Sequence, residues 1–392
     1  MSVLERSRLR ALAIKTESTS GTDAIAGTPA AGDWVDAEFS ISPDMVITPD
    51  PSFTGSLDNR AGIVGGARFT IAGVRVPLRG SGAAGTVPEW FRVLEASSMV
   101  LTATASAVGA PTAATAGTTT TATLAAPFAA TANLYRFMPV TLSGNPATPR
   151  TTLITDYTAG RVATFSRTFA TLTTSTLAII PINNLLRLTD TETDFKTLTV
   201  YAYQGGQLYI GTYCIAVNPR IELVAGQPGF LIFDILGVMA DASPAETALP
   251  AGAATVSRPT PPIWRGGEAQ IGRAEARAQR ATFTLGTTGI LAPAPEAANG
   301  FDGGHVMARG LRAEIQLMTN STASAARVAL MRAGTDTLFS AIIGSTAGNR
   351  LGIIFSPGRI VGQPTSSVDG ADADTVVLEP SQAGGSFGIC SF

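Results

Sequence analysis

The clearest alternation of apolar and polar residues lies in residues 65–99. Its apolar positions are, in order, Phe69, Ile71, Val74, Val76 and Leu78. Their spacing changes phase next to Gly73, and such a shift predicts a β-bulge that re-aims one half of a strand. We therefore expect a long strand at residues 66–79, followed by a turn at Gly80-Ser81-Gly82.

A short amphipathic helix is predicted directly after this turn. Thr86 and Glu89 have the spacing of a capping box, and Pro88 falls in the first turn, where a missing N–H does no harm. The apolar positions of this segment, Val87, Trp90, Phe91 and Leu94, recur at helical spacing. They predict a packing helix that buries one face.

Short alternating runs between turn residues predict further strands along the chain. Their approximate ranges are 38–42, 45–49, 134–142, 152–157, 161–165, 197–203, 208–215 and 230–235. Residues 103–125, which are almost entirely Ala, Thr, Gly and Ser, read as a flexible or edge-strand entry to a separate unit. We expect residues 103–182 to form an inserted β module, and the proline-containing residues 241–262 to form a linker.

The segment after the linker repeats the element order of the first part. Thr282-Phe283-Thr284-Leu285 is similar to Glu38-Phe39-Ser40-Ile41, and Val361-Gly362-Gln363-Pro364 is similar to Ala225-Gly226-Gln227-Pro228. A strand at 307–317 and a helix at 323–333 follow in the order seen in the first part. The pattern predicts a tandem duplication. The expected domains are 1–102 with 183–250, the inserted module 103–182, and 251–392.

Composition favours an all-β fold with short helices. The chain has 392 residues, 45% of them hydrophobic and only 14% charged, with 41 Gly and 24 Pro. Such a chain has many short strands and turns, and its low charge suits a protein that hides surface in an assembly. The net charge of −2 argues against nucleic-acid binding as the main function, because that requires clustered cations.

The order of motifs resembles one known family. A segment with Lys15-Thr16-Glu17, then a long strand, an LRGSG turn and a PEWFRVLEASS helix are similar to the tail tube (major tail) proteins of long-tailed bacteriophages. The resemblance covers roughly residues 8–102 and resumes after residue 185. It implies β-sandwich domains whose sheets join between subunits into a large β-barrel, with rings stacked into a conduit for double-stranded DNA.

Several further expectations follow from this resemblance. The chain would act in the virion tail, with sister copies, a tape measure protein and a tail terminator as partners, after synthesis in the host cytoplasm. Duplication predicts trimeric rings with pseudo-six-fold symmetry; without it, rings would be hexameric. The inserted module would project outward, and residues 1–35 (a polar N-terminal arm) and 35–65 would contact the adjacent ring.

The two long strands, 66–79 and 306–317, are the candidates for lining the channel and pairing across subunits. The residues expected there are Arg68, Thr70, Arg75, Arg79, Arg309, Arg312, Glu314 and Gln316. A slightly acidic, lysine-poor chain suits a lumen that does not bind its cargo, because DNA affinity rises with each cation that contacts a phosphate.

No catalytic or metal site can be assembled from the sequence. His305 is the only histidine, and Cys214 and Cys390 lack metal-ligand spacing. The acidic runs at 190–194 and 369–374 are expected to be solvated turns. The alternatives are a pair of glycosidase carboxylates at 190–194 and a calcium-binding loop at 369–374. We expect no enzyme activity and no cofactor.

Trp90 and Trp264 are expected in the core, and the mixed-charge run from Arg273 to Arg280 on the surface. No membrane association is expected: the N-terminus is not a secretion signal, and the most apolar run, 230–240, is interrupted by Asp234. The alternative function is a carbohydrate-binding or adhesin-like β-sandwich protein, which would need clustered exposed aromatic residues.

Overall fold

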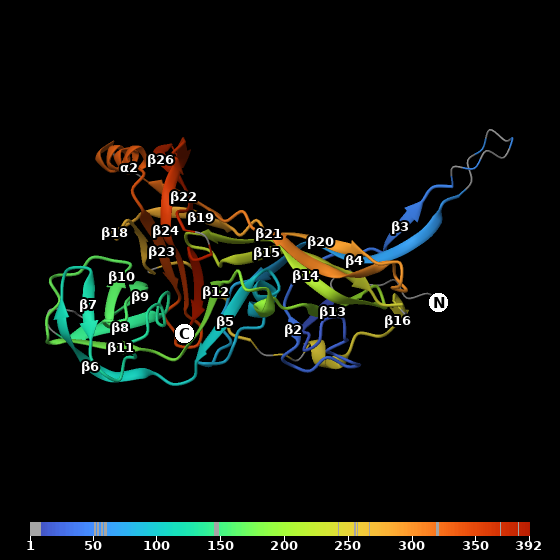
Figure 1. Cartoon of the computed structure of the whole chain (residues 1–392), viewed down its shortest axis with the longest axis horizontal. Helices are drawn as coiled ribbons and strands as arrows, with labels where there is room; N and C mark the ends of the chain where they lie inside the picture. Colours follow the sequence, from blue (N-terminus) through green and yellow to red (C-terminus); the bar gives the residue numbers. More distant parts are fainter. Residues whose placement is uncertain are drawn as a thin grey trace.

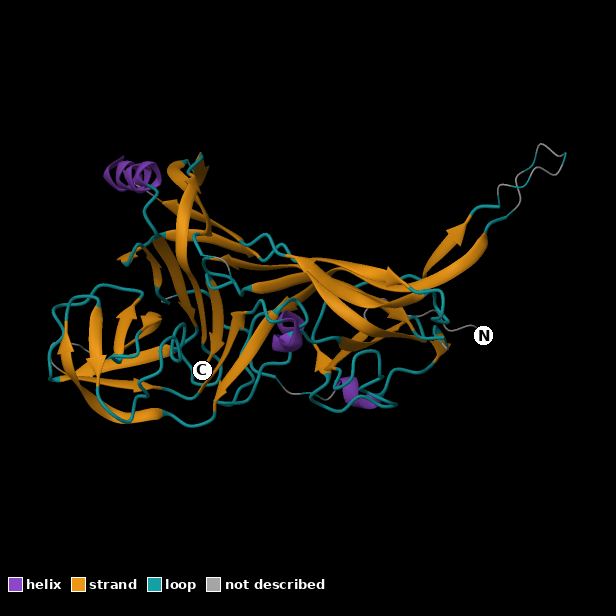
Figure 2. Cartoon of the chain, in the orientation of Figure 1, coloured by secondary structure: helices purple, strands orange, loops and turns teal. Residues whose placement is uncertain are grey.

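The computed structural model describes residues 9–392 except 51, 53–54, 56–57, 59–60, 145–148, 242, 255, 257, 266, 319–320, 369 and 383. Most of these residues lie in antiparallel strands, and the described part contains two α-helices, α1 (Phe91–Glu95) and α2 (Ser321–Ala333). The all-β class with short helices is therefore confirmed. Figures 1 and 2 show two sheet regions, a separate barrel and one long hairpin that reaches away from the rest.

The first half of the chain forms one continuous antiparallel ladder. Its strands are, in spatial order, β1 (Ala11–Thr16), β13 (Leu198–Gln204), β14 (Gln207–Val224), β15 (Phe230–Met239) and β4 (Ile63–Pro77). The strand β3 (Asp44–Thr48) pairs with the start of β4, and together they form the long β3–β4 hairpin of Figure 1. Near the end of β4, Glu38 forms a bridge to Arg75, so residues 36–41 flank β4 on the side opposite β15.

The second half repeats this order strand for strand. Its ladder is β17 (Ala269–Ile271), β23 (Thr337–Ile343), β24 (Leu351–Gly362), β26 (Ala371–Pro380), β22 (Arg312–Met318) and β19 (Ala278–Thr284). In this half β20 (Thr288–Pro293) and β21 (Phe301–Ala308) form the hairpin that precedes β22. Each half thus has a hairpin that leads into the fifth strand of its ladder, β4 or β22, and a helix after that strand.

Two connections join the halves. The end of β14 pairs through Arg220–Val224 with Arg280–Thr284 of β19, which makes one sheet out of the two ladders. The C-terminal strand β27 (Phe387–Ser391) lies between β24 and β12 (Asn183–Leu188), and β12 in turn pairs with β5 (Met99–Thr104). A single hydrophobic core containing Phe69, Phe233 and Phe283 therefore runs through both halves.

A closed barrel lies between β5 and β12 in sequence. Its strands are β6 (Val108–Gly117), β7 (Thr121–Leu124), β8 (Pro139–Gly144), β9 (Arg150–Tyr157), β10 (Val162–Phe165) and β11 (Thr176–Ile180). Because β5 pairs with β12, the segment enters and leaves at adjacent points of the sheet. The barrel is not a detached decoration, since its core includes Ile342, Ile354 and Cys390 of the second half.

The remaining elements are short. They are β2 (Trp34–Val35), β16 (Ala245–Glu246), β18 (Ala274–Glu275), β25 (Thr365–Val368) and the 3-10 helices Glu192–Asp194 and Ala251–Ala254. The strand β25 continues β24 along β26 after a break at Pro364. This break is where Val361-Gly362-Gln363-Pro364 lies, whereas Ala225-Gly226 forms a hairpin turn, so these two similar motifs are not structural counterparts.

Several details of the prediction are confirmed. Gly73 has φ +65°, and its N–H is hydrogen-bonded to Asp234 Oδ1 at 2.7 Å where the ladder shifts register, as a bulge requires. Trp90, Phe91 and Leu94 are fully buried.

Other details were wrong. The N-cap of α1 is Trp90, without a side-chain cap, so Thr86 and Glu89 form no capping box. Val87 lies before the helix and is exposed. Residues 11–16 are not a free arm: they form β1, and Leu12 and Ile14 are buried because β13 and the core cover them. Residues 1–8 lie outside the described part of the chain.

Candidate assembly surface

One face of the sheet is lined by polar side chains across both halves. Directly opposed residues of antiparallel strands point to the same side. The register from Arg75 through Arg220 to Arg312 therefore follows one face across β4, β15, β14, β19 and β22. Its polar members are Arg68, Thr70, Arg75, Arg220, Glu222, Arg280, Thr282, Thr284, Arg312, Glu314, Gln316 and Thr375. We call this surface the polar sheet face.

The arginines of this face stand beside carboxylates. Arg312 Nη2 lies 2.9 Å from Glu314 Oε1, and Glu222 Oε1 lies 3.3 Å from Arg220 Nε and 3.7 Å from Arg280 Nη2. These pairs are half exposed, so each contributes little to stability. Their effect is electrostatic, because a cation next to a carboxylate offers less positive field to a phosphate.

Six of the eight predicted strand residues lie on this face, and Arg79 does not. Arg79 follows β4, where the chain leaves the sheet, and its buried guanidinium donates to Glu89 Oε1 at 3.0 Å. Glu89 Oε2 also lies 2.9 Å from Arg258 Nη1, and Asp36 contacts both arginines. Charges taken out of water need such partners, so Arg79 belongs to an internal ion cluster that fastens the 241–262 linker to α1.

We expect Glu89→Ala to lower the free energy of unfolding by about 3 kcal/mol, because it leaves Arg79 and Arg258 buried without their shared carboxylate. Urea unfolding followed by tryptophan fluorescence measures the change. The control is Glu296→Ala, which removes an exposed carboxylate on the loop after β20. Equal stability of the two variants would contradict the assigned role.

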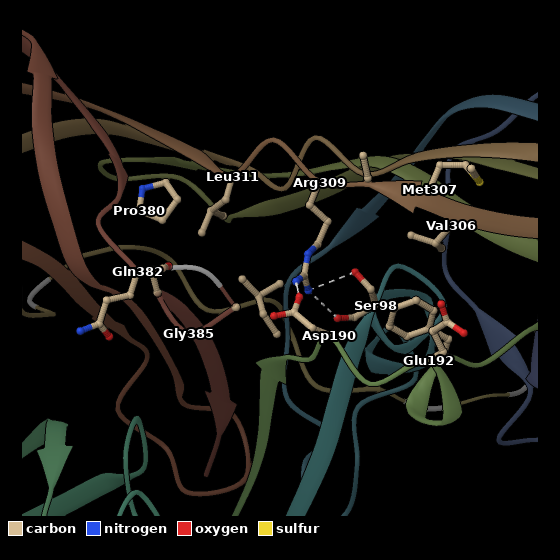
Figure 3. A pocket seen from close by; sticks show the side chains of 15 residues that line it. Ser98, Asp190, Glu192, Val306, Met307, Arg309, Leu311, Pro380, Gln382 and Gly385 are labelled. Carbon is tan, nitrogen blue, oxygen red and sulfur yellow. Dashed lines mark hydrogen bonds and ion pairs between the residues drawn. The ribbon is translucent and has the colours of Figure 1, made fainter.

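Arg309 also lies away from the polar sheet face, at the break between β21 and β22 where one strand was predicted. Figure 3 shows it pointing into a groove of about 420 Å³. There Arg309 Nη1 donates to Thr189 O at 2.8 Å and Ser98 O at 3.2 Å, and its guanidinium pairs with Asp190. Asp190 is therefore held in an ion pair with Arg309.

Two segments at opposite ends of the combined sheet carry no further strand among the described residues: residues 36–41, which form a single β-bridge, and the stretch 359–368. At one end, residues 36–41 are bonded to β4 through Glu38 and Arg75 at 2.8 and 2.9 Å, while the side chains of Arg10 and Gln204 bond Phe39 O and the main chain of Ile41. At the other end, the stretch 359–368 of β24 and β25 pairs with β26 on one side only, apart from the pair Thr337–Gly358 just before it.

The proline within this second edge does not block it. Thr375 N–H donates to Pro364 O at 2.9 Å, so the main-chain groups of Pro364 point toward β26. Because N–H and C=O of neighbouring residues alternate between the two sides of a strand, Thr365 directs its own groups outward. An edge of this kind is a template for another strand.

The β3–β4 hairpin exposes apolar side chains. Ile63, Ile47 and Val64 are 71%, 63% and 59% exposed, in strands that extend away from every other element in Figure 1. A neighbouring group of large exposed apolar residues is uncommon on a protein that works alone. This hairpin is therefore a candidate contact surface.

The remaining candidates for chemistry have structural roles. Cys214 and Cys390 are fully buried, and burial raises the pKa of the Cys390 thiol to about 12. His305 is exposed, with Nε2 4.0 Å from Asp302.

In the acidic run 369–374, Asp374 accepts a hydrogen bond from Arg327 of α2 at 2.6 Å, and Asp369 lies outside the described residues. Trp90 and Trp264 are buried, and the described residues hold no cluster of three or more metal-ligating side chains.

Two further features of the described residues bear on function. The large hydrophobic residues exposed in the described chain include no aromatic side chain, which a sugar-binding platform would require. Neither described helix has the length and apolar character needed to cross a bilayer.

No model of a known protein family and no curated protein matches this chain.

Sequence reasoning missed three features of these surfaces. The Glu89 cluster joins residues far apart in sequence, and no local pattern indicates it. The break of β24 at Pro364 could have been found from the proline itself. The third is a Gly-x-x-Gly-Gly motif that occurs in both hairpins, at Gly62–Gly66 and Gly300–Gly304, and was visible in the sequence.

Proposed function

We propose that this chain is a structural protein that assembles with copies of itself into closed rings, which stack into the tube of a bacteriophage tail. One observation carries the proposal. The chain already contains one joint between repeated ladders, β14 with β19, and the same two kinds of edge are left over at its ends.

The correspondence between these edges follows from the ladders. Residues 36–41 flank β4 as β19 flanks β22, since Glu38 opposes Arg75 and Thr282 opposes Glu314. The 359–368 stretch flanks β26 as β14 flanks β15. Pairing the 359–368 edge of one copy with residues 36–41 of the next would repeat the β14–β19 joint between molecules.

Such a joint is head-to-tail, and a head-to-tail interface closes into a ring when its rotation divides the circle evenly. Three chains would supply six copies of the repeated ladder, which favours trimeric rings with pseudo-six-fold symmetry. Ring closure leaves no strand edge exposed in the plane of the ring.

The polar sheet face would then line the channel. Its arginines stand beside carboxylates, so a passing double-stranded DNA would meet little net positive charge. The closed barrel packs on β23, β24 and β27, on the core side of that sheet, and would lie on the outside of the ring. A tape measure protein inside the tube and a terminator at its end would be further partners.

Negative-stain electron microscopy of the purified chain tests the proposal. We expect rings or tubes with a central channel, and three chains per ring by mass measurement of isolated rings. Monomers at every concentration and salt condition would reject the proposal, and six chains per ring would reject the trimer.

A further inference from the structure

The two hairpins of the chain are counterparts with different surroundings. Each leads into the fifth strand of its ladder and carries Gly-x-x-Gly-Gly, at Gly62–Gly66 where β4 begins and at Gly300–Gly304 where β21 begins. The β20–β21 hairpin lies across β14 and β15 of the first half, whereas the β3–β4 hairpin extends into solvent (Figure 1).

The glycines of the β20–β21 hairpin are what let it lie so close. A Cβ at Gly303 would come within 2.6 Å of the Tyr213 ring, and one at Gly304 within 2.7 Å of Tyr213 O. Real Cβ atoms do not approach other atoms so closely, so only glycine fits at these two positions. Asn299 Nδ2 also donates to Met239 O at 2.6 Å, which fixes the hairpin to the end of β15.

The corresponding glycine of the β3–β4 hairpin, Gly65, has room for a Cβ among the described residues. A Cβ at Gly65 would meet only Thr48 Oγ1 at 3.4 Å and Val46 O at 3.8 Å, both in its own hairpin. The φ of Gly65 is not in the left-handed region, so its backbone does not require glycine either. Gly66 is needed within the chain, because a Cβ there would come within 2.7 Å of Asn299 O. Among the described residues, Gly65 and the exposed Ile63 and Val64 have no such contact with another element.

We propose that the β3–β4 hairpin lies across β24 and β26 of the neighbouring copy whose 359–368 edge pairs with residues 36–41 of the hairpin's own chain. The β20–β21 hairpin lies across β14 and β15 in the same way within one chain. The ladders identify the receiving surface: β24 and β26 stand in the positions of β14 and β15. Its exposed residues include Val361, 49% exposed, and the pair Arg359–Asp336. We call it the β24–β26 surface.

Consecutive hairpins would overlap in this arrangement. The turn of the β20–β21 hairpin already touches the base of the β3–β4 hairpin, where Ala67 N–H donates to Asn299 O at 3.4 Å. A hairpin that arrives from a neighbour would meet the base of the β20–β21 hairpin in the same way. The inference rests on the proposed ring, because it uses the same order of repeats around a circle.

The first test is Gly65→Val, matched by Gly160→Val on the turn between β9 and β10, where a Cβ would come no closer to another atom than 3.6 Å, at the Thr158 hydroxyl. Both variants should fold with the thermal midpoint of the natural chain. Gly65→Val should raise the concentration needed for half assembly at least about tenfold, because the added side chain keeps the backbone of residue 65 away from the neighbouring copy. Assembly of Gly65→Val at the natural concentration would overturn the inference.

The second test separates this contact from assembly itself. Chains carrying Val64→Cys are mixed with chains carrying Val361→Cys and treated with a short bis-maleimide, whose reach tolerates a residue or two of register. The two natural cysteines are fully buried, so they should not react. We expect covalent dimers, and none when Val361→Cys is replaced by Thr115→Cys on the barrel.

The outcomes are distinct. Rings or tubes that give no link between Val64 and Val361 would reject the hairpin contact and leave the proposed function standing. Monomers that give no link would reject both. A yield of cross-linked dimers no higher than that of the Thr115→Cys control would also count against the contact, because random collision would explain it.

Discussion

Replacing Thr365 by proline is expected to weaken assembly at least about tenfold while the single chain remains folded. The N–H of Thr365 points away from β26, because its neighbour Pro364 uses its carbonyl oxygen to accept from Thr375 at 2.9 Å. Proline removes that N–H and places its ring on the open edge, but it breaks no hydrogen bond of the ladder within the chain.

The size of the effect follows from the hydrogen bonds that the proposed joint between chains would lose. An acceptor left unpaired in a closed interface costs about 1–3 kcal/mol, and every joint of a ring carries the same defect. The concentration needed for half assembly should therefore rise by at least about tenfold, measured by sedimentation velocity. Thr365→Val is the matched control, since it alters the same side chain and keeps the N–H. A proline variant that assembles like the natural chain would exclude this edge from the interface.

The sequence predicted the repeated parts of the fold well, because each depends on local chemistry. Alternation of apolar and polar residues, with its change of phase next to Gly73, located β4 and its bulge, and the helical spacing of Trp90, Phe91 and Leu94 located α1. Six of eight predicted strand residues share one face, since the period of a strand is fixed at two.

The failures occur where distant parts of the chain decide the outcome. Arg79 continues the alternation of β4, but Glu89 and Arg258 draw it into a buried cluster. Arg309 takes an apolar position of the alternation, between Met307 and Leu311, and the strand breaks there because the hairpin before it crosses to the first half. Residues 103–125 look flexible because they lack large side chains, whereas closure of the barrel orders them as β6 and β7.

The strand edges illustrate the same limit at the level of function. Nothing in the residues 36–41 or 359–368 marks them as edges, because an edge is defined by what fails to pair with it. Only the ladder shows that Glu38 and Thr282 occupy the same place and that one of them lacks the strand that the other has.

Reversing charge on the polar sheet face should turn a surface that ignores DNA into one that binds it. Glu222 and Glu314 stand beside Arg220, Arg280 and Arg312, so Glu222→Lys with Glu314→Lys removes both carboxylates and adds two cations to the same strip. We expect the natural chain to give no binding of a short duplex at physiological salt. The double variant should bind at low salt at least about tenfold more tightly than the natural chain, and lose affinity steeply as salt rises.

Fluorescence anisotropy of a labelled duplex with unassembled chains measures this effect without requiring DNA to enter a tube. The matched control is Glu192→Lys with Glu296→Lys, which makes the same change of net charge at exposed positions outside the polar sheet face. Because non-specific affinity depends on how many phosphates a group of cations can reach together, scattered lysines should add little. Equal binding by the two double variants would mean that net charge alone matters and that the pairing of arginines with carboxylates on this face has no part in keeping DNA free.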